Sequence, residues 1–219
     1  YAGQRADGST TNRLQRVLSQ SQISTVAAGF DHTLLLKNDG TLWGIGDNQQ
    51  GQLGLNDTTS RTTPVLIDSG VAGAAVSYRH SLYRKNDGTL WSMGWNSNGQ
   101  LGTGTTDNEL TPVQVSTHVT AVAAGFSHSL FIKTDETLWA MGNNNNGQLG
   151  TDSLPLLFNP TQITTDVRDV STGDYHSLIL KKDGSLWATG YNAFGQLGDG
   201  TTTQTLTPVQ IATGVQNIA

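Results

Sequence analysis

The sequence predicts an all-β fold of the β-propeller class, and three observations support this prediction. Four of the five histidines, four of the five tryptophans, four aspartates and four Gly-Gln-Leu-Gly tetrapeptides recur at a spacing of 48 residues. Each repeat contains four short apolar segments separated by turn-forming residues. No stretch of ten residues has the periodicity of an amphipathic helix. The recurring residues are His32, His80, His128 and His176; Trp43, Trp91, Trp139 and Trp187; Asp39, Asp87, Asp135 and Asp183; and the tetrapeptides that begin at Gly51, Gly99, Gly147 and Gly195.

Four segments of the first repeat are expected to form strands, namely 23–28, 32–37, 41–45 and 64–67. The second and third are joined by Asn38-Asp39-Gly40, and Asp-Gly predicts a type I′ hairpin turn, in which both central residues have a positive φ. Pro64 is compatible with the start of a strand or with a sheet edge. We therefore expect each repeat to be an antiparallel meander.

The second strand is apolar on both faces in most repeats, as in 34–36, 130–132 and 178–180. Such a strand needs a packed layer on each side. Identical sheets arranged around an axis supply these layers, which is the architecture of a propeller. A β-solenoid is disfavoured because its parallel coils need no tight hairpins, and an α/β fold is disfavoured because no helical pattern separates the strands.

Composition excludes several classes of function. The 219 residues include 30 Thr, 15 Asn and 26 Gly but only 13% charged residues, and the net charge is −5. An acidic chain without a basic face is not typical of nucleic-acid binders. The absence of cysteine rules out disulfides, thiol catalysis and thiolate metal sites, but leaves the compartment open. No apolar run is long enough for a membrane-spanning helix.

The repeat assigns the whole chain, 1–219, to one propeller segment. The complete repeats are 26–73, 74–121, 122–169 and 170–217. Residues 1–22 match the end of a repeat, because Gly3-Gln4 aligns with Gly51-Gln52, and residues 218–219 match the start of another. Four blades with two partial ones do not close a ring. We therefore expect a segment of a longer propeller or, alternatively, self-association through the incomplete terminal blades.

The repeat motif AAG-x-x-H-[ST]-L-x-L-K-x-D-G-x-L-W-x-x-G-x-N-x-x-GQLG resembles that of the regulator of chromosome condensation (RCC1-like) family. The resemblance covers nearly the whole chain and implies a propeller, commonly of seven blades. The uniform repeat length and the segment 199–203 (DGTTT) look more like bacterial members, and would fit a secreted or cell-surface location. The family name also suggests an exchange factor for a small GTPase.

Residues present in every repeat are interpreted as scaffold, because a specific site rarely needs four identical copies. We expect the four histidines to bind neighbouring backbone, the tryptophans to pack between blades and the aspartates to belong to turns. His118, which lies in a linker and has no histidine counterpart in the other repeats, is expected to be solvated. No Ser/His/Asp set or metal-ligand spacing stands out, so the chain is predicted to be no enzyme and to need no cofactor or metal.

Variable residues gather in the loops between strands 1 and 2 and between strands 3 and 4 of each repeat. In a meander these loops lie at the same end of the blade, so we expect them to form one face. Its composition is typical of protein interfaces. The candidate partner-binding residues are Trp95, Tyr191, Phe194, Tyr78, Arg79, Phe30, Asp31, Phe126, Asp174, Tyr175 and Tyr1. For Phe30 and Phe126, packing beneath the blades is an equally open interpretation.

These observations favour a non-enzymatic protein-binding module. The alternatives are a regulator of a small GTPase that resembles a guanine-nucleotide exchange factor, and a propeller that binds carbohydrate through the same aromatic residues.

The third repeat provides a local test of the equivalence of the copies. It has Asp135-Glu136 where the other three have Asp-Gly. If the turn is the same, Glu136 must adopt a positive φ, which costs a residue with a Cβ about 1 kcal/mol. We expect the turn to be kept, because the constant spacing leaves no room for a shift in register.

Overall fold

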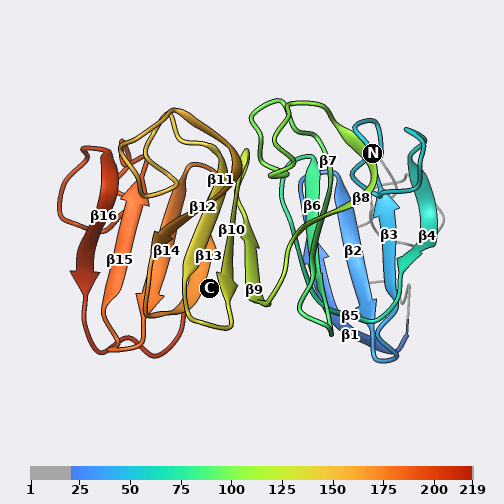
Figure 1. Ribbon diagram of the computed structural model, residues 1–219, viewed down its shortest axis with the longest axis horizontal. Helices are drawn as coiled ribbons and strands as arrows, with labels where there is room; N and C mark the ends of the chain where they lie inside the picture. Colours follow the sequence, from blue (N-terminus) through green and yellow to red (C-terminus); the bar gives the residue numbers. More distant parts are fainter. Residues whose placement is uncertain (1–20, 219) are drawn as a thin grey trace, which may run out of the picture.

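The computed structural model describes residues 21–218, which form four antiparallel sheets of four strands each (Figure 1). In every sheet the strands lie side by side in chain order, as a meander does. These residues contain no helix, and so none that could span a membrane. The strands are β1 (Ile23–Ala28), β2 (His32–Lys37), β3 (Leu42–Gly46) and β4 (Arg61–Asp68); β5 (Val71–Val76), β6 (His80–Lys85), β7 (Leu90–Gly94) and β8 (Glu109–Ser116); β9 (Val119–Ala124), β10 (His128–Lys133), β11 (Leu138–Asn143) and β12 (Leu156–Thr164); and β13 (Val167–Thr172), β14 (His176–Lys181), β15 (Leu186–Gly190) and β16 (Thr205–Ala212).

The four sheets are propeller blades whose first strands face one another. β1 contacts β5, β5 contacts β9, and β9 contacts β13. The strands stand upright in Figure 1, with the outer strands β4 and β16 at opposite ends of the long axis. The predicted all-β propeller of four-stranded blades is therefore confirmed.

The hydrophobic core is divided among the interfaces between blades. Leu34, Leu36 and Leu42 of the first blade pack with Val71, Tyr83 and Met93 of the second. Equivalent clusters join the second blade to the third and the third to the fourth. Each blade therefore depends on its neighbour for burial of its apolar faces, which is how repeat architectures are stabilised.

The tryptophans lie at these interfaces, as predicted, but they are partly rather than fully buried. Trp91, Trp139 and Trp187 each pack against the cluster shared with the preceding blade. Each indole N–H donates to the hydroxyl two residues earlier, as Trp43 does to Thr41 at 2.8 Å. That hydroxyl donates to the recurring turn aspartate, here Asp39 at 2.6 Å, so the aspartates belong to turns as expected.

The fourth strand is longer than the sequence predicted. β4 runs over Arg61–Asp68 rather than 64–67, and β3 begins and ends one residue later than expected. Pro64 lies inside the strand, which is possible because β4 has a neighbour on one side only within its sheet. The pairing of β3 with β4 shifts register between Leu42 and Trp43 and again between Gly44 and Gly46, which accommodates the extra length.

The hairpin turn differs from the predicted type I′. The amide of Gly40 donates to the carbonyl of Lys37 at 3.0 Å, and the amide of Lys37 donates to the carbonyl of Thr41 at 2.9 Å. Gly40 has a φ of 79°, whereas Asp39 does not have a positive φ. This is a three-residue loop, a type I turn followed by one left-handed residue. Only the glycine position needs a left-handed backbone, so aspartate is tolerated before it.

The third blade keeps this turn with glutamate in the glycine position, as expected. Glu136 has a φ of 67°, and its amide donates to the carbonyl of Lys133 at 2.9 Å. Its carbonyl accepts the amide of Val167 from the next blade at 3.0 Å, and its carboxylate is paired with Lys182. The left-handed strain is therefore retained, within a turn that also links two blades.

Candidate functional site

The two sets of loops that hold the variable residues meet at one end of the blades. In each blade, the backbone amide at the junction of the third strand and the 3–4 connection donates to a carbonyl of the 1–2 loop, as the amide of Trp95 does to the carbonyl of Arg79 at 2.9 Å. Asp47, Asn143 and Tyr191 donate in the same way to Asp31, Ser127 and Tyr175, at 2.8–2.9 Å. The hairpin turns lie at the other end of the strands. We call this end the loop face; its loops are 29–31, 47–60, 77–79, 95–108, 125–127, 144–155, 173–175 and 191–204.

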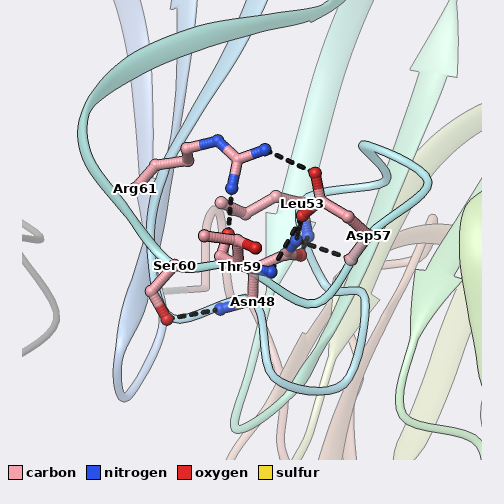
Figure 2. A network of polar contacts seen from close by, with 6 residues as sticks. All are labelled: Asn48, Leu53, Asp57, Thr59, Ser60 and Arg61. Atoms are coloured by element: carbon pink, nitrogen blue, oxygen red, sulfur yellow. Dashed lines mark hydrogen bonds and ion pairs between the residues drawn. The ribbon is translucent and has the colours of Figure 1, made fainter.

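A recurring asparagine holds each long loop in place. The Asn48 side-chain oxygen accepts the amide of Leu53 at 2.9 Å, and its nitrogen donates to the carbonyl of Asp57 at 2.8 Å (Figure 2). Arg61 then pairs with the Asp57 carboxylate at 2.7 Å. Asn96, Asn144 and Asn192 accept the equivalent leucine amides at 2.9–3.0 Å. The asparagines provide a repeated frame on which the variable side chains are displayed.

The aromatic candidates form one continuous set of ring contacts. Ring centroids are 5.2 Å apart for Phe30 and Tyr78, 4.4 Å for Tyr78 and Phe126, and 5.3 Å for Phe126 and Tyr175. Tyr175 continues to Tyr191 at 6.4 Å, and Tyr191 to Phe194 at 6.2 Å. Trp95 contacts both Tyr78 and Phe126. We call this set the aromatic row; its members are Phe30, Tyr78, Trp95, Phe126, Tyr175, Tyr191 and Phe194.

The members of the aromatic row differ in exposure. Phe194 is 86% exposed, Phe30 70% and Tyr175 37%. Tyr78, Trp95, Phe126 and Tyr191 are half-buried. For Phe30 and Phe126, the sequence left both packing beneath the blades and partner binding open. Phe126 packs between neighbouring rings, whereas Phe30 is largely in solvent.

The remaining candidates lie beside the row. The Arg79 guanidinium is 4.9 Å from the centroid of the Tyr78 ring, and its Nε is buried with no hydrogen-bond partner within residues 21–218. Asp174 is exposed and Asp31 is half-buried. Tyr1 lies outside the described residues. The structure thus brings these loop-face candidates together, and their role in binding remains a prediction.

Two cavities open among these residues. One, of about 490 Å³, is lined by the 1–2 loops of all four blades, including Phe30, Tyr78, Phe126 and Asp174. The other, of about 550 Å³, lies beside the fourth blade and includes Asp174, Tyr175, Tyr191 and Phe194. The second also includes His176 and Gln196, which the sequence analysis did not select because they recur in the repeat as scaffold, and Asn146, a variable loop residue that was not among the candidates.

The recurring histidines are structural, although their partner is not the expected backbone group. His32, His80 and His128 place Nε2 at 2.9, 3.0 and 3.1 Å from a serine hydroxyl of the next blade. For His80 that serine is Ser129, whose hydroxyl donates to the carbonyl of Gln100 at 2.8 Å. The hydroxyl proton is committed to the carbonyl, so the hydroxyl oxygen accepts and Nε2 must carry the imidazole proton.

Burial keeps these imidazoles neutral. His32, His80 and His128 are fully buried, and burial lowers the pKa of His32 to about 4, against a smaller opposing effect of Asp47. Burial, with small effects of neighbouring histidines, lowers the pKa of His80 and of His128 to about 3. Within residues 21–218 no three His, Asp or Glu side chains cluster as metal ligands would. The histidines therefore join blades and are not positioned for acid–base chemistry.

His118 occupies a strained position in a linker. It is exposed, as expected, and has a φ of 60° where the equivalent Gly70 and Gly214 have 69° and 71°. Its carbonyl accepts the amide of Thr134 at 2.8 Å. Its role is to link the second and third blades through the backbone.

Comparisons with known proteins agree with this architecture. The family model described as the RCC1-like domain matches residues 2–219. A crystal structure of Saccharomyces cerevisiae Prp20p, described with its binding to Gsp1p and histones, has a TM-score of 0.79 and 23% identity, and the match covers 88% of this chain and 51% of that one. Human WBSCR16 has a TM-score of 0.81 and 23% identity, with coverage of 93% and 56%.

At this identity the likeness concerns the fold. The chain spans about half the length of both solved structures. No curated protein sequence matches the chain.

Proposed function

The chain belongs to the RCC1-like domain family, and from that premise we propose that it is a non-enzymatic protein-binding module whose loop face contacts the partner. The observation that supports this proposal is the aromatic row. Blade cores are completed by the clusters between sheets, yet seven further aromatic rings gather at one end, and Phe194 and Phe30 are mostly exposed. Exposed aromatic side chains on a rigid frame are what protein interfaces use as anchors.

The frame beneath the row suits a recognition surface. Recurring asparagines hold each long loop to its own blade by two or more hydrogen bonds, as Asn48 does. Little conformational entropy is then lost when a partner binds, because the loops are already ordered. The variable positions can differ from blade to blade without disturbing the frame.

Alanine substitution on the loop face tests the proposal. We expect Trp95→Ala and Tyr191→Ala each to weaken partner binding by about 2 kcal/mol, roughly 30-fold, with little loss of stability. Leu206→Ala is the matched control, because Leu206 is 45% exposed but lies on the outer strand β16. Proteins that the wild type and L206A capture, and that a variant with both W95A and Y191A does not, would be purified. The affinity of each variant for them would then be measured by titration. Equal binding by all variants would contradict a role for the loop face.

A second candidate is regulation of a small GTPase in the manner of an exchange factor. It is favoured by the family and by the similarity to Prp20p, which is described as binding Gsp1p. The test is release of labelled GDP from Gsp1p and from a panel of other small GTPases. Acceleration that W95A and Y191A abolish would support this candidate, and no acceleration on any GTPase would exclude it for the proteins tested.

Binding of carbohydrate by the same aromatic rings is the remaining alternative, and a glycan array distinguishes it. A glycan bound by the wild type and not by Y191A would replace the protein partner in the proposal.

A further inference from the structure

One cavity of the loop face is walled by three aromatic rings and a carboxylate at equivalent positions of the four repeats. Phe30, Tyr78 and Phe126 are 48 residues apart, and the same position in the fourth repeat is Asp174. All four line the cavity of about 490 Å³ where the first strands of the blades converge. The next residue, Tyr175, contacts Phe126 but lines the neighbouring cavity. The exchange of one ring for a carboxylate changes the cavity from apolar to partly anionic.

Rings of this chain already bind cations. The Arg79 guanidinium lies 4.9 Å from the centroid of Tyr78, one of the cavity rings. Away from the site, Lys133 lies 4.0 Å from the centroid of Trp139 and Lys37 4.2 Å from that of Trp43. An aromatic face attracts a cation through its quadrupole, and the attraction increases when the cation is withdrawn from water. Aromatic walls with an adjacent carboxylate are suited to an ammonium or guanidinium group.

Charge is distributed unequally between the two ends of the blades. The loops of the loop face contain seven aspartates and one basic residue, Arg79; of the seven, Asp57 pairs with Arg61 at the start of β4. All five lysines of the chain lie at the hairpin end. The aspartates are Asp31, Asp47, Asp57, Asp107, Asp152, Asp174 and Asp199, and the lysines are Lys37, Lys85, Lys133, Lys181 and Lys182. The loop face therefore attracts positively charged partners and repels acidic ones.

We propose that this cavity receives a lysine or arginine side chain from a cationic segment of a partner protein. The cation enters the cavity, where the exposed Phe30 ring lies against it and the Asp174 carboxylate balances its charge. This inference rests on the proposed function of the loop face and names the class of partner. The same charge and ring arrangement disfavours acidic segments and nucleic acid.

Nona-arginine, nona-lysine and nona-glutamate peptides with a fluorescent label are suitable probes. Binding is followed by anisotropy, and its location by tryptophan fluorescence. Trp95 contacts Tyr78 and Phe126, whereas the other four tryptophans lie at the hairpin half of the blades beside Thr or Ser hydroxyls. We expect the cationic peptides to bind and to change the tryptophan emission. Trp95→Phe should bind with similar affinity but lose most of the emission change.

Three variants separate the cavity from general charge attraction. Asp174→Asn and Phe30→Leu should each weaken nona-arginine binding by about tenfold, since each removes one wall of the cavity. Asp152→Asn removes the same charge from an exposed loop-face residue that does not line the cavity, and should weaken binding less than about twofold. All three residues are exposed, so the variants should fold normally.

Several outcomes would overturn the inference. Equal weakening by D174N and D152N would show attraction to overall charge alone. An emission change that persists in Trp95→Phe would place the peptide elsewhere. Failure of the cationic peptides to bind, or preferred binding of nona-glutamate, would exclude the cationic class. Loss of a captured partner from W95A and Y191A would still support the loop face in that case, so the two proposals fail separately.

Discussion

Mild acid should unfold this protein through its buried histidines. His32, His80 and His128 are fully buried and neutral in the fold, with pKa values lowered to about 4, 3 and 3 from an ordinary 6.5. In the unfolded chain they return to the ordinary value. A group whose pKa is lowered by folding stabilises the fold fully above its unfolded pKa. That stability is lost as the pH falls from 6.5 toward 4, because the unfolded state takes up protons that the folded state does not.

The structure indicates how steep the loss is. Each of the three imidazoles has Nε2–H donating to a serine, while Nδ1 is buried with no hydrogen-bond partner within residues 21–218. Protonation would therefore add both a buried charge and an unsatisfied N–H donor. Near pH 5.5 unfolding takes up about one proton for each histidine, so the free energy of unfolding falls by roughly 1.4 kcal/mol per pH unit for each and about 4 for the three.

Urea unfolding at pH 7.0, 6.5, 6.0, 5.5 and 5.0 measures this dependence. The turn aspartates, such as Asp39, also have lowered pKa values because threonine hydroxyls and amides donate to them. Their ordinary pKa of 3.8 confines their contribution to more acidic conditions. The slope between pH 6 and 5 therefore reports mainly on histidine.

The control is His80→Gln, which should lower stability at pH 7 and reduce the uptake by about one proton. Ser129→Ala removes the hydroxyl that pairs with His80, and should cost about 1–3 kcal/mol at pH 7 because a buried donor and an acceptor lose their partners. Uptake of one proton or fewer by the wild type would refute the reasoning, since it would mean that the buried rings are already charged in the fold.

Further predictions concern backbone strain and association. Glu136→Gly should raise the free energy of unfolding by about 0.5–1 kcal/mol, because glycine adopts a φ of 67° without strain. The gain is reduced by whatever the exposed ion pair between Glu136 and Lys182 contributes. A lower melting midpoint would contradict this prediction. His118→Gly, at a φ of 60°, should be stabilising by a similar amount in the same thermal assay, whereas His118→Val should destabilise. The 219-residue chain should self-associate through the fourth blade. The space beside Gly198 is open, since a Cβ placed there would meet nothing within 4 Å, whereas one on its counterpart Gly102 would meet Pro160 of the next blade. A monodisperse monomer in sedimentation at tens of micromolar would argue against this.

Much of this molecule follows from the sequence by itself. The spacing of 48 residues determines the number of sheets, and the four apolar segments in each repeat determine the strands. β1 and β2 begin and end at the residues that the sequence predicted. The common end of the variable loops also follows, because in any meander alternate connections lie at the same end. These are local properties of the chain, and four copies repeat the same evidence.

Other features depend on contacts that no single repeat contains. The carbonyl of the left-handed residue in the hairpin accepts an amide of the next blade, as that of Gly40 does from Val71. The histidine partner is a serine of the following blade, which lies 49 residues away in sequence. The contact between Phe126 and Tyr175 depends on how the first strands converge, and so does the place of Asp174 in a cavity that three aromatic residues also line. The repeated sequence determines the strands of each blade. Which loop residues meet depends on the angle and distance between blades, and these are set by the packing of the cores between them.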